Sequence, residues 1–128
     1  MSELKRRILI ADDETVIADT LALILRAVGF ESMAVYSGEE AVRAAPLFRP
    51  NILISDVIMP GITGIEAAIV ICELLPECKV ILISGQAATA DLIAHAGAKV
   101  CNFEILLKPC QPPVLIERVR RLVSFDCA

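Results

Sequence analysis

The sequence predicts an α/β fold: a doubly wound sheet of five parallel strands that alternate with five helices. Two observations lead to this fold class. Short runs rich in Ile, Leu and Val recur along the chain, as expected for strands buried on both faces of a parallel sheet. Longer segments with helix-like patterns separate these runs, and such alternation implies right-handed crossovers with helices on both faces. The 128 residues are enough for one domain, residues 1–128.

The first strand is expected at residues 8–11, where four apolar residues precede an acidic pair. Residues 14–28 are expected to form the first helix, because apolar residues such as Val16 and Ile17 recur there at helical spacing. Gly29 is a natural stop for this helix. Residues 31–36 alternate in polarity and are expected to form the second strand.

The next two helices are predicted from their N-terminal signals. Ser37 and Glu40 have the spacing of a capping box, which predicts a short helix that ends near Pro46. The third strand follows at residues 52–55. Thr63 and Glu66 repeat the capping-box spacing and predict a third helix that stops before residue 76.

The last third of the chain is expected to hold two strands and two helices. The strands are expected at residues 80–83 and 105–107. A helix is expected between Ala87 and Ala96, closed by Gly97. Pro112 and the proline after it suit the first turn of a final helix.

Composition excludes several classes of function. The net charge of −4 argues against direct nucleic-acid binding, for which a basic patch is typical. No apolar run approaches the roughly 18 residues needed to span a bilayer, so no membrane association is expected. The N-terminus lacks the pattern of a secretory signal, and we expect a cytoplasmic protein. The five cysteines form no C-x-x-C pair and are expected to be free thiols.

Polar side chains follow four of the predicted strands. They are Asp12 and Asp13, Asp56, Ser84, and Lys108. Ligands bind outside the carboxyl ends of the strands in open α/β sheets, so these side chains are expected to share one crevice. Taken singly, each has a structural interpretation: an aspartate can cap the next helix, a serine before glycine can belong to a turn, and a loop lysine can be solvated.

Together these groups favour phosphoryl transfer. Three carboxylates would repel one another without a cation, and Mg²⁺ prefers such oxygen ligands. An aspartate can act as a nucleophile and form an aspartyl phosphate. Lys108 and Ser84 would then stabilise the oxygens of the transferring group.

The chain resembles the receiver domain of bacterial two-component response regulators. The resemblance rests on Asp12-Asp13, on Asp56-Val57-Ile58-Met59-Pro60 with Gly64, on Ser84-Gly85 and on Lys108-Pro109, and it runs from about residue 5 to residue 123. It implies a flavodoxin-like sheet of order 2-1-3-4-5. It also implies a cis peptide between Lys108 and Pro109.

The resemblance assigns a role to each residue. Asp56 is the phosphoacceptor, and Asp12, Asp13 and Asp56 hold Mg²⁺ with the backbone carbonyl of Ile58. Lys108 pairs with the phosphoryl group, and Ser84 moves toward it to favour an active conformation. The implied partner is a sensor histidine kinase or a phosphotransfer protein. A homodimer remains open as a further partner.

The chain departs from the family at the residue that usually couples the phosphoryl site to a conformational change. The family commonly has an aromatic residue three positions before the lysine, where this chain has Ile105. Phe103 should share the face of Ile105 if the strand extends that far. We expect any switching not to use the usual coupling between the serine and an aromatic residue.

Three functions are weighed. The first is a phosphorylation-controlled signalling module that is not an enzyme with an external substrate. The second is a docking or dimerisation module that works without phosphorylation. The third is a small phosphatase that works through Asp56, although no substrate-binding insertion is evident.

Overall fold

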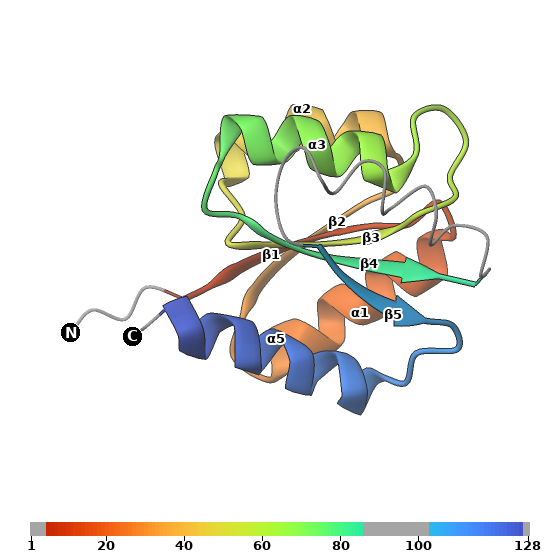
Figure 1. Cartoon of the computed structure of the whole chain (residues 1–128). Coiled ribbons are helices and arrows are strands. Elements are labelled where there is room, and N and C mark those ends of the chain that lie inside the picture. Colours follow the sequence, from red (N-terminus) through yellow and green to blue (C-terminus); the bar gives the residue numbers. More distant parts are fainter. Residues whose placement is uncertain (1–4, 86–102, 127–128) are drawn as a thin grey trace.

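Five parallel strands form one sheet in the order β2-β1-β3-β4-β5, in a computed structural model that describes residues 5–85 and 103–126 (Figure 1). The predicted order is confirmed. The strands are β1 (Arg7–Ala11), β2 (Glu31–Val35), β3 (Ile52–Asp56), β4 (Lys79–Ser84) and β5 (Phe103–Leu107).

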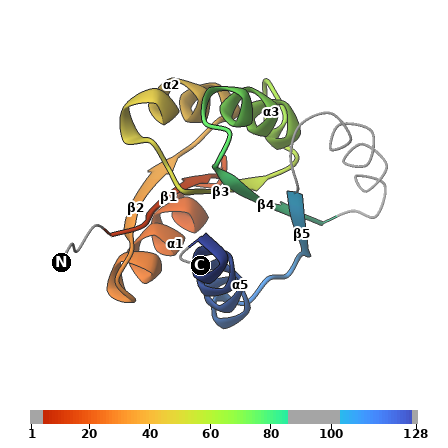
Figure 2. The ribbon, with the colours of Figure 1, turned by 60° about the vertical axis from the view of Figure 1, so that its left-hand side comes forward.

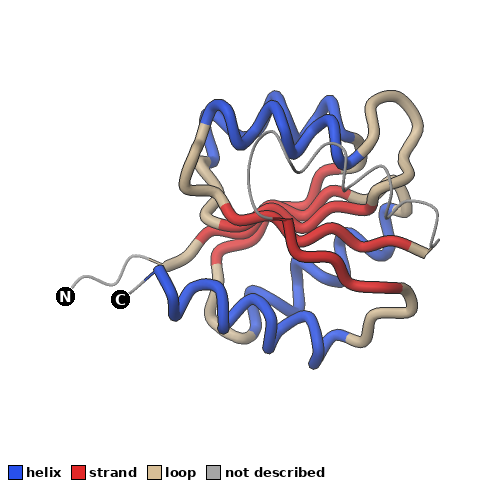
Figure 3. The backbone as a smooth tube through the Cα atoms, in the orientation of Figure 1, coloured by secondary structure: helices blue, strands red, loops and turns tan. Residues whose placement is uncertain are grey.

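Helices cover both faces of the sheet, as predicted. The described helices are α1 (Thr15–Ala27), α2 (Gly38–Phe48), α3 (Gly64–Leu74) and α5 (Pro112–Asp126). Figures 1 and 2 show α2 and α3 on one face, and α1 and α5 on the other. The result is a three-layer arrangement, which is plainest in the tube drawing of Figure 3. The helix expected between Ala87 and Ala96 lies outside the described residues.

The core consists of two apolar layers, one on each face. Successive strand residues point to opposite faces, so Leu9 enters the layer under α2 and α3 while Ile8 and Ile10 enter the layer over α1 and α5. Every residue of β3 is buried, which explains its continuous apolar run. A fully buried Ile or Leu side chain contributes roughly 1.5–3 kcal/mol. The central strands therefore form a rigid base for the residues that follow them.

The local signals at the helix ends are confirmed in part. Gly29 ends α1 with φ +107°, a conformation that favours glycine. Thr63 and Glu66 form the complete capping box. The Ser37 side chain accepts a hydrogen bond from the Glu40 amide at 3.0 Å, but the Glu40 carboxylate accepts from the amide of Tyr36 at 2.9 Å. The second half of the predicted box is therefore displaced by one residue.

Two helices add detail that the sequence patterns did not specify. Helix α2 continues past Pro46 to Phe48, because a proline in the last turn removes only its own amide donor and the Arg49 amide still bonds to the Ala45 carbonyl. Val16 does not face the core and is 75% exposed. The buried face of α1 is formed by small residues instead, which let this helix approach the sheet closely; they are Ala18 and Ala22, together with Leu25.

Strand β5 begins at Phe103, so Phe103 and Ile105 do share a face of the sheet. Phe103 is half-buried against the layer under α2 and α3, whereas Ile105 is 40% exposed. On the other face, Arg118 of α5 pairs with Glu104 and ties the edge strand to that helix. Within residues 5–85 and 103–126, none of the helices has the length and apolarity needed to cross a membrane.

Candidate phosphoryl site at the carboxyl ends of the strands

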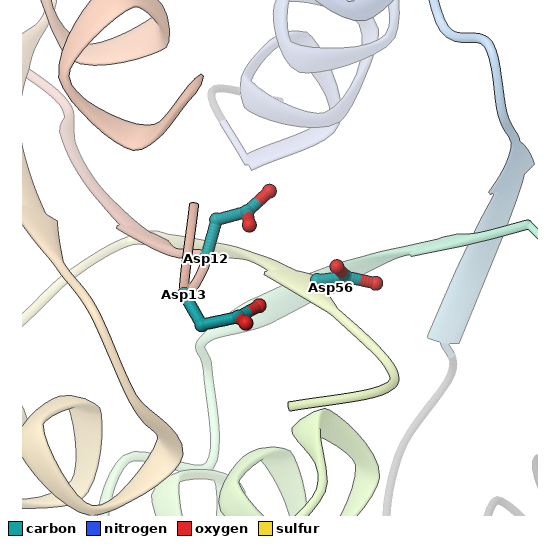
Figure 4. Close-up of side chains that lie close together, drawn as sticks. All are labelled: Asp12, Asp13 and Asp56. Carbon is teal, nitrogen blue, oxygen red and sulfur yellow. The ribbon is translucent and has the colours of Figure 1, made fainter. Parts of the chain in front are cut away.

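Three carboxylates meet at the carboxyl edge of the sheet. Asp12, Asp13 and Asp56 each offer an oxygen, and these atoms all lie within 4.8 Å of one another. The strand register places them there, since Ala11 at the end of β1 pairs with Ser55, the residue before Asp56 on β3. Figure 4 shows the side chains of Asp12 and Asp13 leaving the end of β1 and extending toward the side on which Asp56 lies. The predicted acidic cluster is therefore present.

Asp12 is buried within this cluster. It is only 6% exposed, and its Oδ1 accepts a hydrogen bond from the Glu14 amide at 2.9 Å. Burial raises the pKa of Asp12, and the charges of Asp56 and Asp13 raise it further, against the opposing effects of the Glu14 amide and Lys108. Asp12 thus supports the turn into α1, but Glu14 is the N-cap residue.

Lys108 brings a cation to the phosphoacceptor candidate. Its Nζ lies 3.0 Å from Oδ2 of Asp56, which is itself 7% exposed. Burial alone would lower the pKa of Lys108, but the hydrogen bond and the charge of Asp56 raise it above its usual value. The backbone holds this residue in place, because the Lys108 amide donates to the Ser84 carbonyl at 2.9 Å. The Lys108–Pro109 peptide is cis, as the resemblance implied.

Ser84 ends β4 on the neighbouring strand. Asp56 is in register with Ile83, so Ser84 lies one residue further toward the carboxyl edge. It is 2% exposed. The four strand ends predicted to converge therefore do converge, with Ser84 and Lys108 contributed by β4 and by the segment after β5.

The loop between β3 and α3, residues 57–63, begins at this site. Ile58 is the second residue after Asp56, and it is 53% exposed. The loop is closed at its base by the Gly64 amide, which donates to the Val57 carbonyl at 2.9 Å. Gly64 itself approaches β3 so closely that a Cβ there would lie 2.1 Å from the Asp56 carbonyl oxygen. Only glycine allows this approach of α3 to the end of β3.

The donor set fits a magnesium ion. The clustered ligand atoms are all carboxylate oxygens, which is the chemistry that Mg²⁺ prefers. Burial first, and then the charges of Asp56 and Asp13, raise the pKa of Asp12, and a divalent cation would offset both effects.

Two features near the site escaped the sequence analysis. One is a groove of about 640 Å³ that opens beside Asp12 and Lys108 and is lined mainly by apolar residues of α1 and by the start of α5. Its sequence signal is the apolar pair Val16 and Ile17, which we used only as evidence of helical spacing. The other is Glu39, whose carboxylate contacts the loop after β3 and which had no signal beyond its place next to a capping residue.

Comparisons with known proteins agree with this geometry. A sequence model of the response regulator receiver domain matches residues 8–120. The DNA-binding response regulator MtrA of Mycobacterium tuberculosis is 28% identical over 123 residues, which cover 94% of this chain and 51% of MtrA. The chain thus spans about half the length of this curated relative.

Solved structures show the same fold. A CheY-like receiver domain protein from Methanospirillum hungatei superposes with a TM-score of 0.84 at 25% identity, covering 96% of this chain and 98% of that one. The response regulator TrrA of Thermotoga maritima, solved in complex with Mg²⁺ and BeF, gives a TM-score of 0.77 at 30% identity, covering 91% and 98%. With the family match over most of its length, this chain belongs to the response regulator receiver domain family of two-component signalling.

Proposed function

We propose that Asp56 accepts a phosphoryl group from a phosphohistidine of a sensor histidine kinase or phosphotransfer protein. The observation that carries this proposal is the 3.0 Å contact between Lys108 Nζ and Asp56 Oδ2 inside a cluster of three carboxylates. The contact leaves Oδ1 of Asp56 outside the pairing with Lys108. This geometry would let Asp56 act as the nucleophile with Lys108 as its electrostatic partner.

The transfer breaks one bond and forms one. An oxygen of Asp56 attacks the phosphorus, and an O–P bond forms while the N–P bond to the donor imidazole breaks. The electron pair of the broken bond stays on the imidazole nitrogen. The transferring group carries negative charge on its oxygens, which the ammonium of Lys108 and the hydroxyl of Ser84 would stabilise.

Asp12, Asp13 and Asp56, with the backbone carbonyl of Ile58, are the residues that would hold Mg²⁺. When bound, this ion supplies positive charge that offsets the carboxylates and the phosphoryl oxygens. The complex of TrrA with Mg²⁺ and BeF supports the assignment by similarity. The clustered carboxylate oxygens of Asp12, Asp13 and Asp56 support it from the chain itself.

The groove beside the site suits the partner that delivers the phosphoryl group. Its lining is largely apolar, with Ile17, Leu21, Pro109 and Leu115 among the lining residues, and Asp12 and Lys108 stand at its edge. A helix from the partner that laid its apolar face here would bring a histidine toward Asp56. We place this encounter in the cytoplasm.

The docking module that works without phosphorylation is less well supported. A docking surface does not require a lysine paired with one of three clustered carboxylates. Burying these charges costs desolvation free energy, and the buried groups would not contribute to the docking contact. The output of the whole protein, and any dimer through which it acts, are further proposals, because the chain spans about half of the relatives it matches.

The test is phosphorylation in solution. The chain is incubated with Mg²⁺ and acetyl phosphate, and its intact mass is followed alongside Asp56→Asn and Asp19→Asn. Asp19 lies outside the cluster, where its carboxylate accepts a hydrogen bond from the Tyr36 hydroxyl, so it is the matched control. We expect one phosphoryl group on wild type and on Asp19→Asn, and none on Asp56→Asn.

Other results would change the assignment. No modification of wild type would favour the docking module. Sustained turnover of a phosphomonoester, abolished by Asp56→Asn, would favour a phosphatase. Omission of Mg²⁺ should slow the modification strongly, and an unchanged rate would argue against the metal ligands proposed here.

A further inference from the structure

The tip of the β3–α3 loop rests on the first turn of α2. Oε2 of Glu39 accepts a hydrogen bond from the Ile62 amide at 3.1 Å. Glu39 is the second residue of α2, and Ile62 lies two residues before α3 begins. A half-buried carboxylate from one element thus holds the backbone of a loop that starts at Asp56.

Two glycines make this contact close on both sides. A Cβ on Gly61 would lie 2.4 Å from Glu39 Oε2 and 2.9 Å from Oε1, and Gly61 also has φ +82°. A Cβ on Gly38 would lie 2.6 Å from Cγ1 of Ile62. A Cβ on Gly61 would therefore displace the Glu39 carboxylate, and a Cβ on Gly38 would press on the side chain of Ile62.

We propose that Glu39 is a positioning residue for the phosphoryl site: its carboxylate fixes the loop that carries Ile58 and so sets the backbone that completes the metal-binding group. This inference rests on the proposed function. The loop is anchored at its start, where the Val57 amide donates to the Ile83 carbonyl at 3.1 Å, and at its end by the Thr63 capping box. Glu39 holds the segment between these anchors from outside the loop.

A general effect of negative charge at the start of α2 does not account for the contact. Both Glu39 and Glu40 lie in the first turn, where the helix dipole favours a negative charge on either residue. Their carboxylates, however, reach different partners: Glu40 bonds to the Tyr36 amide before α2, and Glu39 bonds to the loop. Glu40 is therefore a matched control: it has the same charge, lies in the same helix turn, and makes no hydrogen bond to the β3–α3 loop among the described residues.

The test compares Glu39→Ala, Glu39→Gln and Glu40→Ala in the full chain. Mg²⁺ affinity is measured by calorimetry without a phosphodonor, and the rate of modification by acetyl phosphate is measured against Mg²⁺ concentration. Removal of a residue that orients metal ligands typically weakens metal affinity by about 10- to 100-fold, and we expect the lower end, about 10-fold, for Glu39→Ala. The maximal rate at saturating Mg²⁺ should change much less.

The conservative variant separates position from charge. Gln keeps an oxygen that can accept from the Ile62 amide, so Glu39→Gln should restore most of the affinity lost in Glu39→Ala. Glu40→Ala should stay close to wild type in Mg²⁺ affinity, although both alanine variants lose a similar small amount of stability. A structural role alone would not produce this split.

A second pair of variants tests the contact itself. Gly61→Ala pushes a methyl group against the Glu39 carboxylate, so it should also weaken Mg²⁺ binding. In the double variant Glu39→Ala/Gly61→Ala that clash is gone, and the two effects should be clearly less than additive, as expected for residues in contact. If Glu39→Ala folds poorly, Gly61→Ala and Glu39→Gln still carry the test.

The outcomes are distinguishable. Equal Mg²⁺ affinities of Glu39→Ala and Glu40→Ala, with wild type phosphorylated at Asp56, would overturn the role of Glu39 and leave the proposed function intact. Additive effects of Glu39→Ala and Gly61→Ala would also overturn it. A wild-type chain that neither binds Mg²⁺ nor is modified at Asp56 would overturn the proposed function and this inference with it.

Discussion

Substitution of Gly64 by alanine should destabilise the fold at the point where α3 meets Asp56. A Cβ at this position would lie 2.1 Å from the Asp56 carbonyl oxygen and 2.7 Å from Ser55 Oγ. Because real Cβ atoms essentially never come closer than 3.0 Å, the helix start must retreat by roughly 0.9 Å. The obstacle is backbone of the fully buried central strand β3, which is paired on both sides and cannot move aside cheaply.

The expected magnitude follows from two opposing effects. Overpacking of this kind costs about 1–3 kcal/mol, and a contact against backbone belongs at the upper end. Alanine gains up to about 1 kcal/mol over glycine in helix propensity. The net loss of unfolding free energy should therefore be about 2 kcal/mol, which for a domain of this size corresponds to a fall in Tm of roughly 6–10 °C.

Urea and thermal unfolding of Gly64→Ala and Gly85→Ala measure this effect. Gly85 is the matched control beside the same site, because a Cβ there would meet Lys108 Cδ at 3.5 Å, an ordinary contact with a flexible side chain. Gly85→Ala should change stability by no more than about 0.5 kcal/mol. The reasoning is refuted if Gly64→Ala is as stable as wild type, or if both variants lose the same amount.

Three further predictions concern single side chains. Ile58 is 53% exposed beside Asp56 and should hinder an attacking water, so Ile58→Asn should lose the phosphoryl group faster than wild type; an equal or slower loss contradicts this. Ser32 Oγ is buried without a hydrogen-bond partner among the described residues, so Ser32→Ala should leave unfolding free energy unchanged or raise it by up to about 1 kcal/mol, and a clear loss in urea unfolding would argue against it. Burial raises the pKa of the Cys110 thiol despite the nearby charge of Arg118, so less thiolate is present at pH 8 and mass mapping should show slower alkylation than for glutathione. Alkylation as fast as that of glutathione would mean that Cys110 is more exposed than its surroundings in the groove indicate.

Much of the site was predictable because its polar residues stand at the ends of apolar strands. Asp12, Asp56 and Ser84 each follow a buried run, and parallel strands bring such positions to one edge of the sheet. The register then places Asp12 beside Asp56, and the placement of Lys108 follows from the end of β5. Here the sequence pattern and the topology lead to the same arrangement.

The apolar groove was not predictable by the same reasoning. Helical spacing shows that α1 has an apolar face, but it does not show how much of that face the sheet can cover. The alanines Ala18 and Ala22 are buried in the core, whereas Val16 and Ile17 line the groove together with Lys108 and Pro109. Periodicity alone could not separate a residue that packs on the core from one that lines a surface groove.

The residues that position the site differ in kind from those that carry its chemistry. Asp56 and Lys108 act through atoms that they possess, and a polar atom in an apolar context stands out in a sequence. Gly61 and Gly64 matter because they have no Cβ. A Cβ on Gly61 would meet the Glu39 carboxylate, and a Cβ on Gly64 would meet the Asp56 carbonyl. The first contact joins segments that are far apart in the sequence, and the second joins the two ends of a loop. Patterns of neighbouring residues therefore do not predict either contact. For this reason the variants that best test the geometry of the site are changes at Gly61, Gly64 and Glu39, none of which contributes an atom to the proposed reaction.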